Sequence, residues 1–190
     1  MSYTIKVILV GDGAVGKTTL RKKYMGETTS TQYLQTLGAD ISVNDFIFED
    51  NKNKEKIPVK ILIWDIAGQP AVSEMHSMYY KGAHAIFLVY DITNYQSYQN
   101  IENWIANVSK NLKIGKLPIM LLNNKVDYSG DIVKVNKQDG EILAKKLSKI
   151  YTDGTWEIPV VETSALTGKN VDLVFNEIVR MVFDIQKLQK

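Results

Sequence analysis

The sequence contains no cysteine among its 190 residues. Disulfides, thiolate zinc sites and cysteine nucleophiles are therefore excluded, as are prenyl and palmitoyl anchors on the chain as given. This composition suits a reducing compartment, so we expect a cytoplasmic protein whose contact with membranes, if any, is peripheral. No apolar run is long enough to span a bilayer, and the first residues lack the pattern of a signal peptide.

Arginine and net charge are also scarce. Only Arg21 and Arg180 are arginines among the 23 basic residues, and the net charge is +2. Such a small excess of positive charge gives no indication of nucleic acid as a partner. The apolar and charged fractions are ordinary for a soluble globular protein. A chain of this length is enough for one α/β domain with a substantial core.

The most informative stretch is the octapeptide from Gly11 to Thr18, which reads GDGAVGKT. It matches G-x-x-x-x-G-K-[ST], with an apolar run at 4–10 before it and a run compatible with a helix at 19–25 after it. Glycines let backbone N–H groups point toward a phosphate, and a helix N-terminus adds partial positive charge. We expect Lys17 to reach the β- and γ-phosphates and the Thr18 hydroxyl to ligate Mg²⁺. A chance glycine turn before a helix is the alternative for this stretch taken alone.

Short apolar runs alternate with helical patterns along the rest of the chain, which is typical of parallel βαβ units. The patterns predict strands at 4–10, 40–49, 58–65, 85–91, 118–122 and 159–162, and helices at 19–25, 72–81, 138–150 and 171–186. A further helix presents one apolar face, made of Tyr98, Ile101, Ile105 and Val108. In the helix at 138–150, the residues expected toward the core are Ile142, Leu143, Leu147 and Ile150.

Two polar stretches allow two interpretations each. The charged residues 50–56 predict a hairpin with a long, solvated tip, and a basic interaction patch is the alternative. Residues 26–38 are polar and rich in threonine, and composition alone favours a plain surface loop.

Polar residues follow two of the apolar strands. Asp65 ends one of them, and Asn124-Lys125-Val126-Asp127 follows another. Ligands of open α/β sheets bind outside the carboxyl ends of the strands, so these residues are expected to converge with Lys17 on one ligand. A carboxylate accepts both the N1–H and the 2-amino group of guanine, whereas adenine offers no such pair of donors. Asp127 therefore favours guanine over adenine, and argues against an ATPase or a kinase.

Five motifs in order resemble those of the Ras-superfamily small GTPases, and most of all their Rab branch. The resemblance covers almost everything from Ile5 to about Val182. It implies a P-loop NTPase of the Ras-like G-domain type. This α/β fold has a six-stranded, mostly parallel sheet with one antiparallel hairpin strand and helices on both faces. Residues 1–190 would form a single domain with a P-loop at 11–18, switch I at about 27–40, switch II at about 65–81 and a short helical C-terminus.

The resemblance also implies roles for individual residues. Catalytic roles would fall to Lys17, Thr36 and Gln69, with Gln69 orienting the attacking water. Mg²⁺ would be held by Thr18, Thr36 and, through a bound water, Asp65. The GTP or GDP would be bound by Gly11, Asp12, Gly13, Ala14, Val15, Gly16, Lys17, Thr18, Thr19, Tyr33, Thr36, Gly68, Asn124, Lys125, Asp127, Ser164, Ala165 and Leu166. Leu166 stands where the family has a lysine, so stacking by a lysine stem on the base is only partly replaced.

The function implied is that of a molecular switch that binds GTP or GDP with Mg²⁺ and hydrolyses GTP slowly. Neither arginine lies in a switch segment, so the chain supplies no arginine finger, and acceleration is expected from a GTPase-activating protein. An exchange factor and effectors would bind the switch regions of a monomer. Trp64 and Tyr79 are candidate aromatic contacts for an effector, and for either residue a place in the core is the alternative. We read His84, at the start of a strand, as structural.

Pro70 follows Gln69 where Rab proteins usually have glutamate, and it fixes the backbone beside the glutamine. A nucleotide-bound scaffold with negligible hydrolysis is therefore the alternative function. A purely structural GTP-binding subunit is a further one.

Overall fold

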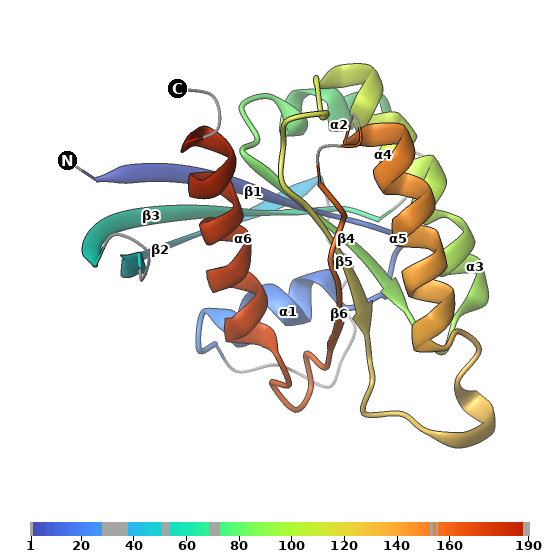
Figure 1. The fold of residues 1–190 in the computed structure, drawn as a ribbon. Helices are drawn as coiled ribbons and strands as arrows, with labels where there is room; N and C mark the ends of the chain where they lie inside the picture. Colours follow the sequence, from blue (N-terminus) through green and yellow to red (C-terminus); the bar gives the residue numbers. More distant parts are fainter. Residues whose placement is uncertain are drawn as a thin grey trace.

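The computed structural model describes residues 2–27, 38–50, 54–68, 73–152, 154 and 156–187 (Figure 1). Its strands are β1 (Tyr3–Val10), β2 (Ala39–Asp50), β3 (Glu55–Ile66), β4 (Ala85–Asp91), β5 (Ile119–Asn124) and β6 (Val160–Thr163). Its α-helices are α1 (Lys17–Tyr24), α2 (Ser73–Tyr80), α3 (Tyr95–Gln99), α4 (Ile101–Asn111), α5 (Lys137–Tyr151) and α6 (Val171–Lys187). Within these ranges no helix is both long enough and apolar enough to cross a bilayer.

The six strands form one sheet in the order β2-β3-β1-β4-β5-β6. All neighbouring pairs are parallel except β2 and β3, which form an antiparallel hairpin. The mostly parallel sheet with one antiparallel hairpin strand is thus confirmed. The strand order reverses at β1, which has β3 on one side and β4 on the other. Such a reversal opens a crevice at the carboxyl end of the strands, and the loop after β1 lies at this point.

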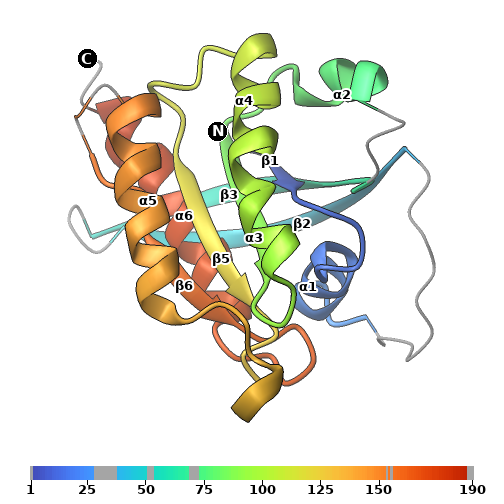
Figure 2. The same ribbon diagram turned by 90° about the vertical axis from the view of Figure 1, so that its right-hand side faces the viewer.

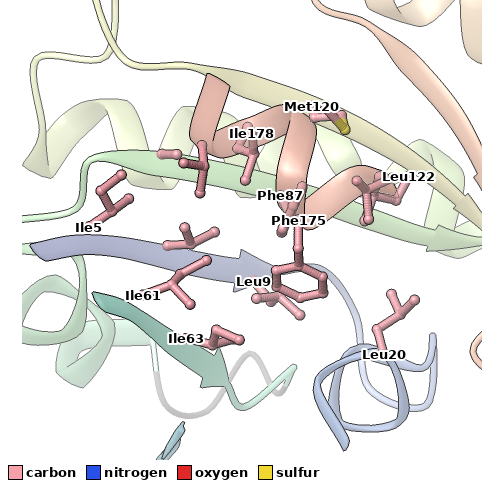
Figure 3. Close-up of a cluster of buried hydrophobic side chains, with 14 of the residues drawn as sticks. Ile5, Leu9, Leu20, Ile61, Ile63, Phe87, Met120, Leu122, Phe175 and Ile178 are labelled. Atoms are coloured by element: carbon pink, nitrogen blue, oxygen red, sulfur yellow. The ribbon is translucent and has the colours of Figure 1, made fainter. Parts of the chain in front are cut away.

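Helices cover both faces of the sheet, and a separate core fills each side. Leu20 of α1 and Phe175 and Ile178 of α6 pack on one face against residues such as Leu9 and Phe87 (Figure 3). The other core receives apolar residues from α2, α4 and α5. Figure 2 shows α3, α4 and α5 in front of the sheet with α6 behind it. Strands buried on both faces read as continuous apolar runs, which is why β1 and β4 could be recognised from the sequence.

The hairpin tip is much shorter than the sequence suggested. β2 runs to Asp50 and β3 begins at Glu55, and these two residues are paired in the ladder. The expectation of a long solvated tip at residues 50–56 was therefore wrong. Backbone pairing between the two strands extends the ladder into charged sequence, where the opposed side chains of Glu49 and Lys56 form an ion pair.

Two of the four expected core residues of α5 face solvent. Leu143 and Leu147 are buried as expected, but Ile142 is 66% exposed and Ile150 is 56% exposed. The helix turns its small and apolar residues to the sheet, namely Gly140, Leu143, Ala144, Leu147 and Ser148. Ile142 lies on the far side of this stripe and Ile150 at its margin, since successive residues are about 100° apart around a helix.

The helix predicted around residue 100 is divided in two. α3 ends at Gln99, α4 begins at Ile101, and Asn100 lies between them. Ile101, Ile105 and Val108 are buried as predicted, and Tyr98 is half-buried against the same core. The side chain of Asn94 accepts hydrogen bonds from the N–H groups of Gln96 and Ser97 and so caps α3.

Candidate nucleotide site

The described candidate residues gather at the carboxyl ends of four strands. The P-loop follows β1, Asp65 lies near the end of β3, Asn124 ends β5 and Ser164 follows β6. β3, β1, β4, β5 and β6 are all parallel, so the loops that follow them meet at one edge of the sheet. The sheet therefore brings together residues that are more than 100 positions apart in the sequence.

Two glycines let the P-loop pack closely against its surroundings. Gly16 has a φ of 100°, and a Cβ there would lie 2.3 Å from the Nδ2 atom of Asn124. A Cβ on Gly68, after β3, would lie 2.3 Å from the backbone nitrogen of Gly13. No other residue type fits at either position without displacing backbone or a buried amide. Around them, Val15 is buried, Thr19 is half-buried in the first turn of α1, and Ala14 is exposed with a φ of 62°.

Lys17 is the first residue of α1, and its side chain folds back over the P-loop. Its Nζ atom donates to the backbone oxygens of Gly11 and Asp12, each at 2.7 Å. Burial lowers the pKa of Lys17 to about 8, while the nearby charges of Asp65 and Asp12 act in the opposite direction. A phosphate anion beside this ammonium would restore the favourable interactions that burial removes.

Thr18 and Asp65 meet beneath the P-loop. The Thr18 hydroxyl donates to Oδ2 of Asp65, and Asp65 is fully buried. Burial raises the pKa of this carboxyl, whereas the hydrogen bond from Thr18 and the charges of Lys17 and Arg21 oppose the rise. Its second oxygen, Oδ1, is buried with no hydrogen-bond partner among the described residues.

The Thr18–Asp65 pair fits a magnesium site. Mg²⁺ prefers oxygen ligands and is held by one or two protein groups, with waters and substrate phosphates completing its shell. A hydroxyl and a buried carboxylate with an unpartnered oxygen match that requirement. No group of three or more histidine, aspartate or glutamate side chains in the described part of the chain could hold a metal by itself. The pair would therefore depend on phosphate oxygens for further ligands.

The Asn124 side chain links the P-loop to the end of β6 and to the loop that follows it. Its Nδ2 atom donates to the Val15 carbonyl of the P-loop at 2.8 Å, and its Oδ1 atom accepts from Thr163 Oγ1 at 3.1 Å and from the Ala165 N–H at 3.2 Å. The side chain is fully buried. One amide thus joins the P-loop, the end of β6 and the loop after β6, and uses both its donor and its acceptor in doing so.

The residues expected around the base lie beside Asn124. Ser164 Oγ donates to Asp127 Oδ1 at 2.5 Å, which holds the carboxylate by one oxygen. Lys125 has a φ of 69°, and its ammonium is 2.7 Å from Asp91 Oδ2 at the end of β4. Leu166, which follows Ala165, is 66% exposed, so most of its apolar side chain is accessible to solvent. The exposed Asp127 retains an oxygen for a ligand.

Asp12 has partners that sequence reasoning did not identify. Its two carboxylate oxygens accept hydrogen bonds from Asn100 Nδ2 and Trp104 Nε1, both at 2.7 Å. The P-loop is therefore fixed to the junction of α3 and α4 by a carboxylate with two donors. A tryptophan within the apolar face of the helix was the only signal, because the N–H of a buried indole usually finds an acceptor.

Four residues named from the sequence lie outside the described residues: Tyr33, Thr36, Gln69 and Pro70. The two arginines are both described. Arg180 is on α6 and pairs with Glu177, while Arg21 is buried on α1 and pairs with Asp40 of β2. Trp64 and Tyr79, considered as either exposed contacts or core, are half-buried, with ring centroids 6.2 Å apart. His84 accepts from the Lys6 N–H at 3.0 Å, as a structural histidine would.

A sequence model of the Ras family matches residues 6–184. The chain belongs to the Ras family. Among curated Ras-family proteins, it is 39% identical to Ras-related protein Rab-26 of Mus musculus over 176 residues, which covers 92% of this chain and 61% of that relative. It is 35% identical to Homo sapiens Rab-8B over 94% of this chain and 78% of the relative, and 33% identical to Bos taurus Rab-13 over 94% and 79%. The chain thus spans about three fifths of the length of Rab-26.

Proposed function

We propose that this Ras-family chain is a guanine-nucleotide switch that binds GTP or GDP with Mg²⁺ and hydrolyses GTP slowly. The observation that carries the proposal is the double role of Asn124, which ties the phosphate loop to the loop expected around the base. A ligand with a phosphate chain at one end and a base at the other would contact both loops at once. Asp127 supports guanine, since its carboxylate would accept from two adjacent donors.

The residues divide the work as follows. Lys17 and the P-loop N–H groups would hold the β- and γ-phosphates, and the Gly68 N–H would bind the γ-phosphate. Thr18, Asp65 and Thr36 would hold Mg²⁺, which when bound neutralises charge on the phosphate oxygens. Gln69 would orient the attacking water. Ordering of the switch segments by the γ-phosphate, and their release on hydrolysis, would make the switch.

Slow hydrolysis is expected because neither arginine of the chain is placed to contact the phosphates. Arg21 is buried and bound to Asp40 and Ser42 of β2, and Arg180 lies on α6. Without an arginine at the phosphates, we expect a rate below about 0.01 s⁻¹, the rate with an arginine supplied in cis. An exchange factor, a GTPase-activating protein and effectors would act on a cytoplasmic monomer. The exposed Ile41 and Val43 of β2, beside Trp64, offer effectors an apolar contact surface.

Single-turnover hydrolysis of GTP with Mg²⁺, followed by phosphate release, tests this function. Slow release that is abolished by Gln69→Leu but retained by Gln138→Leu, an exposed glutamine on α5, is the expected result. Release faster than about 0.01 s⁻¹ without a partner would contradict the slow-switch proposal. No release from any of the proteins, with GTP still bound, would favour a nucleotide-bound scaffold in which Pro70 displaces Gln69.

A further inference from the structure

Arg21 lies inside the protein, between α1 and β2. It is 4% exposed, and its guanidinium donates to Ser42 Oγ and, at 2.7 Å, to Asp40 Oδ2. Its NH1 atom is also 3.5 Å from Glu27 Oε1, just after α1. An arginine is seldom this deeply buried unless it is paired, and here the pairing reaches two different segments of the chain.

The position of Arg21 relates it to the candidate metal ligands. It lies one helical turn after Lys17, on the helix that also carries Thr18. Asp40, its partner on β2, is directly opposite Asp65 in the β2–β3 ladder. Like charges at opposed positions of antiparallel strands repel each other. Arg21 and Asp40 both act electrostatically on Asp65, and they do so with opposite signs.

We propose that Arg21 is a positioning residue for the Mg²⁺ and nucleotide site. By binding Asp40 it neutralises the carboxylate that faces Asp65, and it ties the start of β2 to the helix that presents Thr18. One oxygen of Asp65 then accepts from Thr18, and the other stays available for the hydration shell of Mg²⁺. This inference rests on the proposed binding of guanine nucleotide with Mg²⁺, and it assigns no contact between Arg21 and the nucleotide.

The consequence is a changed requirement for Mg²⁺. In Arg21→Met, Asp40 would lose its counter-charge, and its repulsion of Asp65 would act on the position of that carboxylate. We expect the Mg²⁺ concentration that half-suppresses GDP release to rise about tenfold. Arg21→Lys keeps the charge but replaces the two-pronged guanidinium that bridges Ser42 and Asp40, so it is expected to shift the midpoint less than Arg21→Met does. Arg21→Met/Asp40→Asn removes both charges and is expected to recover most of the shift.

The experiment measures dissociation of fluorescently labelled GDP across a Mg²⁺ titration, with a thermal melt of each variant. Lys22→Met removes one positive charge from the next position of α1 and is the matched control. A purely structural role would lower the melting temperature of Arg21→Met without moving its Mg²⁺ midpoint, and that outcome would overturn the proposal. Equal shifts in Arg21→Met and in the double variant would overturn it as well.

Two further results separate the possible failures. Absence of GDP binding by the unmodified protein would refute the proposed function, whereas normal binding with an unshifted Arg21 variant would refute this inference alone. Should Arg21→Met fail to fold, Arg21→Gln takes its place, because glutamine keeps a polar group near Ser42 while removing the charge. An unshifted Mg²⁺ midpoint in Arg21→Gln would then decide against the proposal.

Discussion

The two ends of the candidate site differ in how their polar groups are satisfied. At the base end, Asn124, Ser164 and Lys125 already have protein partners in the positions where a base would be read. At the phosphate end, Lys17 binds carbonyls of its own loop, and Asp65 has one oxygen bound to Thr18 and the other without a partner. Among the described residues, the groups expected around the base are therefore held by protein partners except for the second oxygen of Asp127, whereas the end expected to bind phosphate leaves a buried carboxylate oxygen without a partner.

This difference suggests a division of labour. A preorganised base end gives selectivity at little cost in ordering, because its hydrogen bonds exist before the ligand arrives. The phosphate end holds a buried ammonium and a buried carboxylate, and the proposed binding of phosphates and Mg²⁺ would supply further partners for both. The γ-phosphate is the only part of GTP that GDP lacks, so rearrangement at this end is where a switch has to act.

The largest expected effect comes from breaking the base end. Asp127→Asn replaces an acceptor for two guanine donors with an amide, so one donor of the base would face an N–H₂ group. We expect GTP affinity to fall roughly a thousandfold, since a site built to pair a polar group discriminates strongly against a mismatch. Competition against labelled GDP measures this loss.

The selectivity of Asp127→Asn between GTP and ATP tests whether this residue reads the base. ATP should compete no better with the variant than with the unmodified protein, because adenine gains no partner. Asp131→Asn changes an exposed aspartate in a short 3-10 helix of the same connection between β5 and α5, and as the control it should leave affinity unchanged. An Asp127→Asn variant that binds GTP normally would place guanine recognition elsewhere in the molecule.

A smaller effect is expected where the phosphate end is fixed to the rest of the fold. Asp12→Asn leaves one acceptor for two donors, Asn100 and Trp104, and removes the charge that strengthens both hydrogen bonds. The free energy of unfolding should fall by about 2 kcal/mol, the scale of a charge-assisted hydrogen bond. GDP affinity should fall about tenfold through displacement of the P-loop. Urea unfolding and GDP titration measure the two losses.

Trp104→Phe tests the hydrogen bond between Trp104 and Asp12 by removing its donor. It keeps an aromatic ring in the core and removes the N–H that Asp12 accepts. If the two residues act through one contact, the double variant should lose less than the sum of the single losses. Fully additive losses would show that Asp12 and Trp104 contribute separately. Asp45→Asn, which affects only a long surface ion pair with Lys60, is the control for loss of a carboxylate.

The smallest effect is expected at His84, which is far from both ends of the candidate site. It provides a baseline for how the stability of the fold depends on pH. Its Nδ1 atom accepts from the Lys6 N–H, and burial, aided by the charge of Lys6, lowers the pKa of His84 below its ordinary 6.5. The unfolded chain then binds more protons than the folded one, so this contribution to stability is present above pH 6.5 and is lost as pH falls below it. Thermal melts at pH 7 and pH 5 should show a smaller drop for His84→Gln than for the unmodified protein.

The prediction for His84→Gln can be contradicted by a single result. An equal drop in both proteins would show that carboxylates, and not His84, account for the acid sensitivity. His76→Gln controls for the second of the two histidines in the sequence. Neither change should alter selectivity between GTP and ATP, since His84 immediately precedes β4, at the end of that strand opposite the candidate site.

Much of the fold could be predicted because local patterns and tertiary structure agree. Buried parallel strands such as β4 are continuous apolar runs, and a strand–loop–helix unit around the P-loop has a distinctive glycine pattern. The errors arose where the pattern was ambiguous. Ile150 of α5 lies at the edge of the buried stripe, and only the packing of the helix on the sheet decides which side of that edge is covered.

The site could be predicted as far as motifs describe it. The P-loop, Asp65 and Asn124-Lys125-Val126-Asp127 meet at one edge of the sheet, as the strand pattern required. The two hydrogen bonds to Asp12 could not be foreseen, because their donors, Asn100 and Trp104, lie 88 and 92 residues away and belong to no phosphate-binding pattern. Arg21 was noted only for being rare, and its partners depend on the β2–β3 register, which the sequence does not specify.

The contact between Trp104 and Asp12 also gives the protein its own optical sensor. An indole whose N–H is bound to a carboxylate has an excited state that responds to the charge beside it, and here that carboxylate belongs to the loop expected to hold phosphate. The chain has three tryptophans, and the other two, Trp64 and Trp156, have indole nitrogens without hydrogen-bond partners among the described residues. We therefore expect intrinsic fluorescence to follow the P-loop in unlabelled protein, with Trp104→Phe as the reference that keeps only the signal of the other two tryptophans.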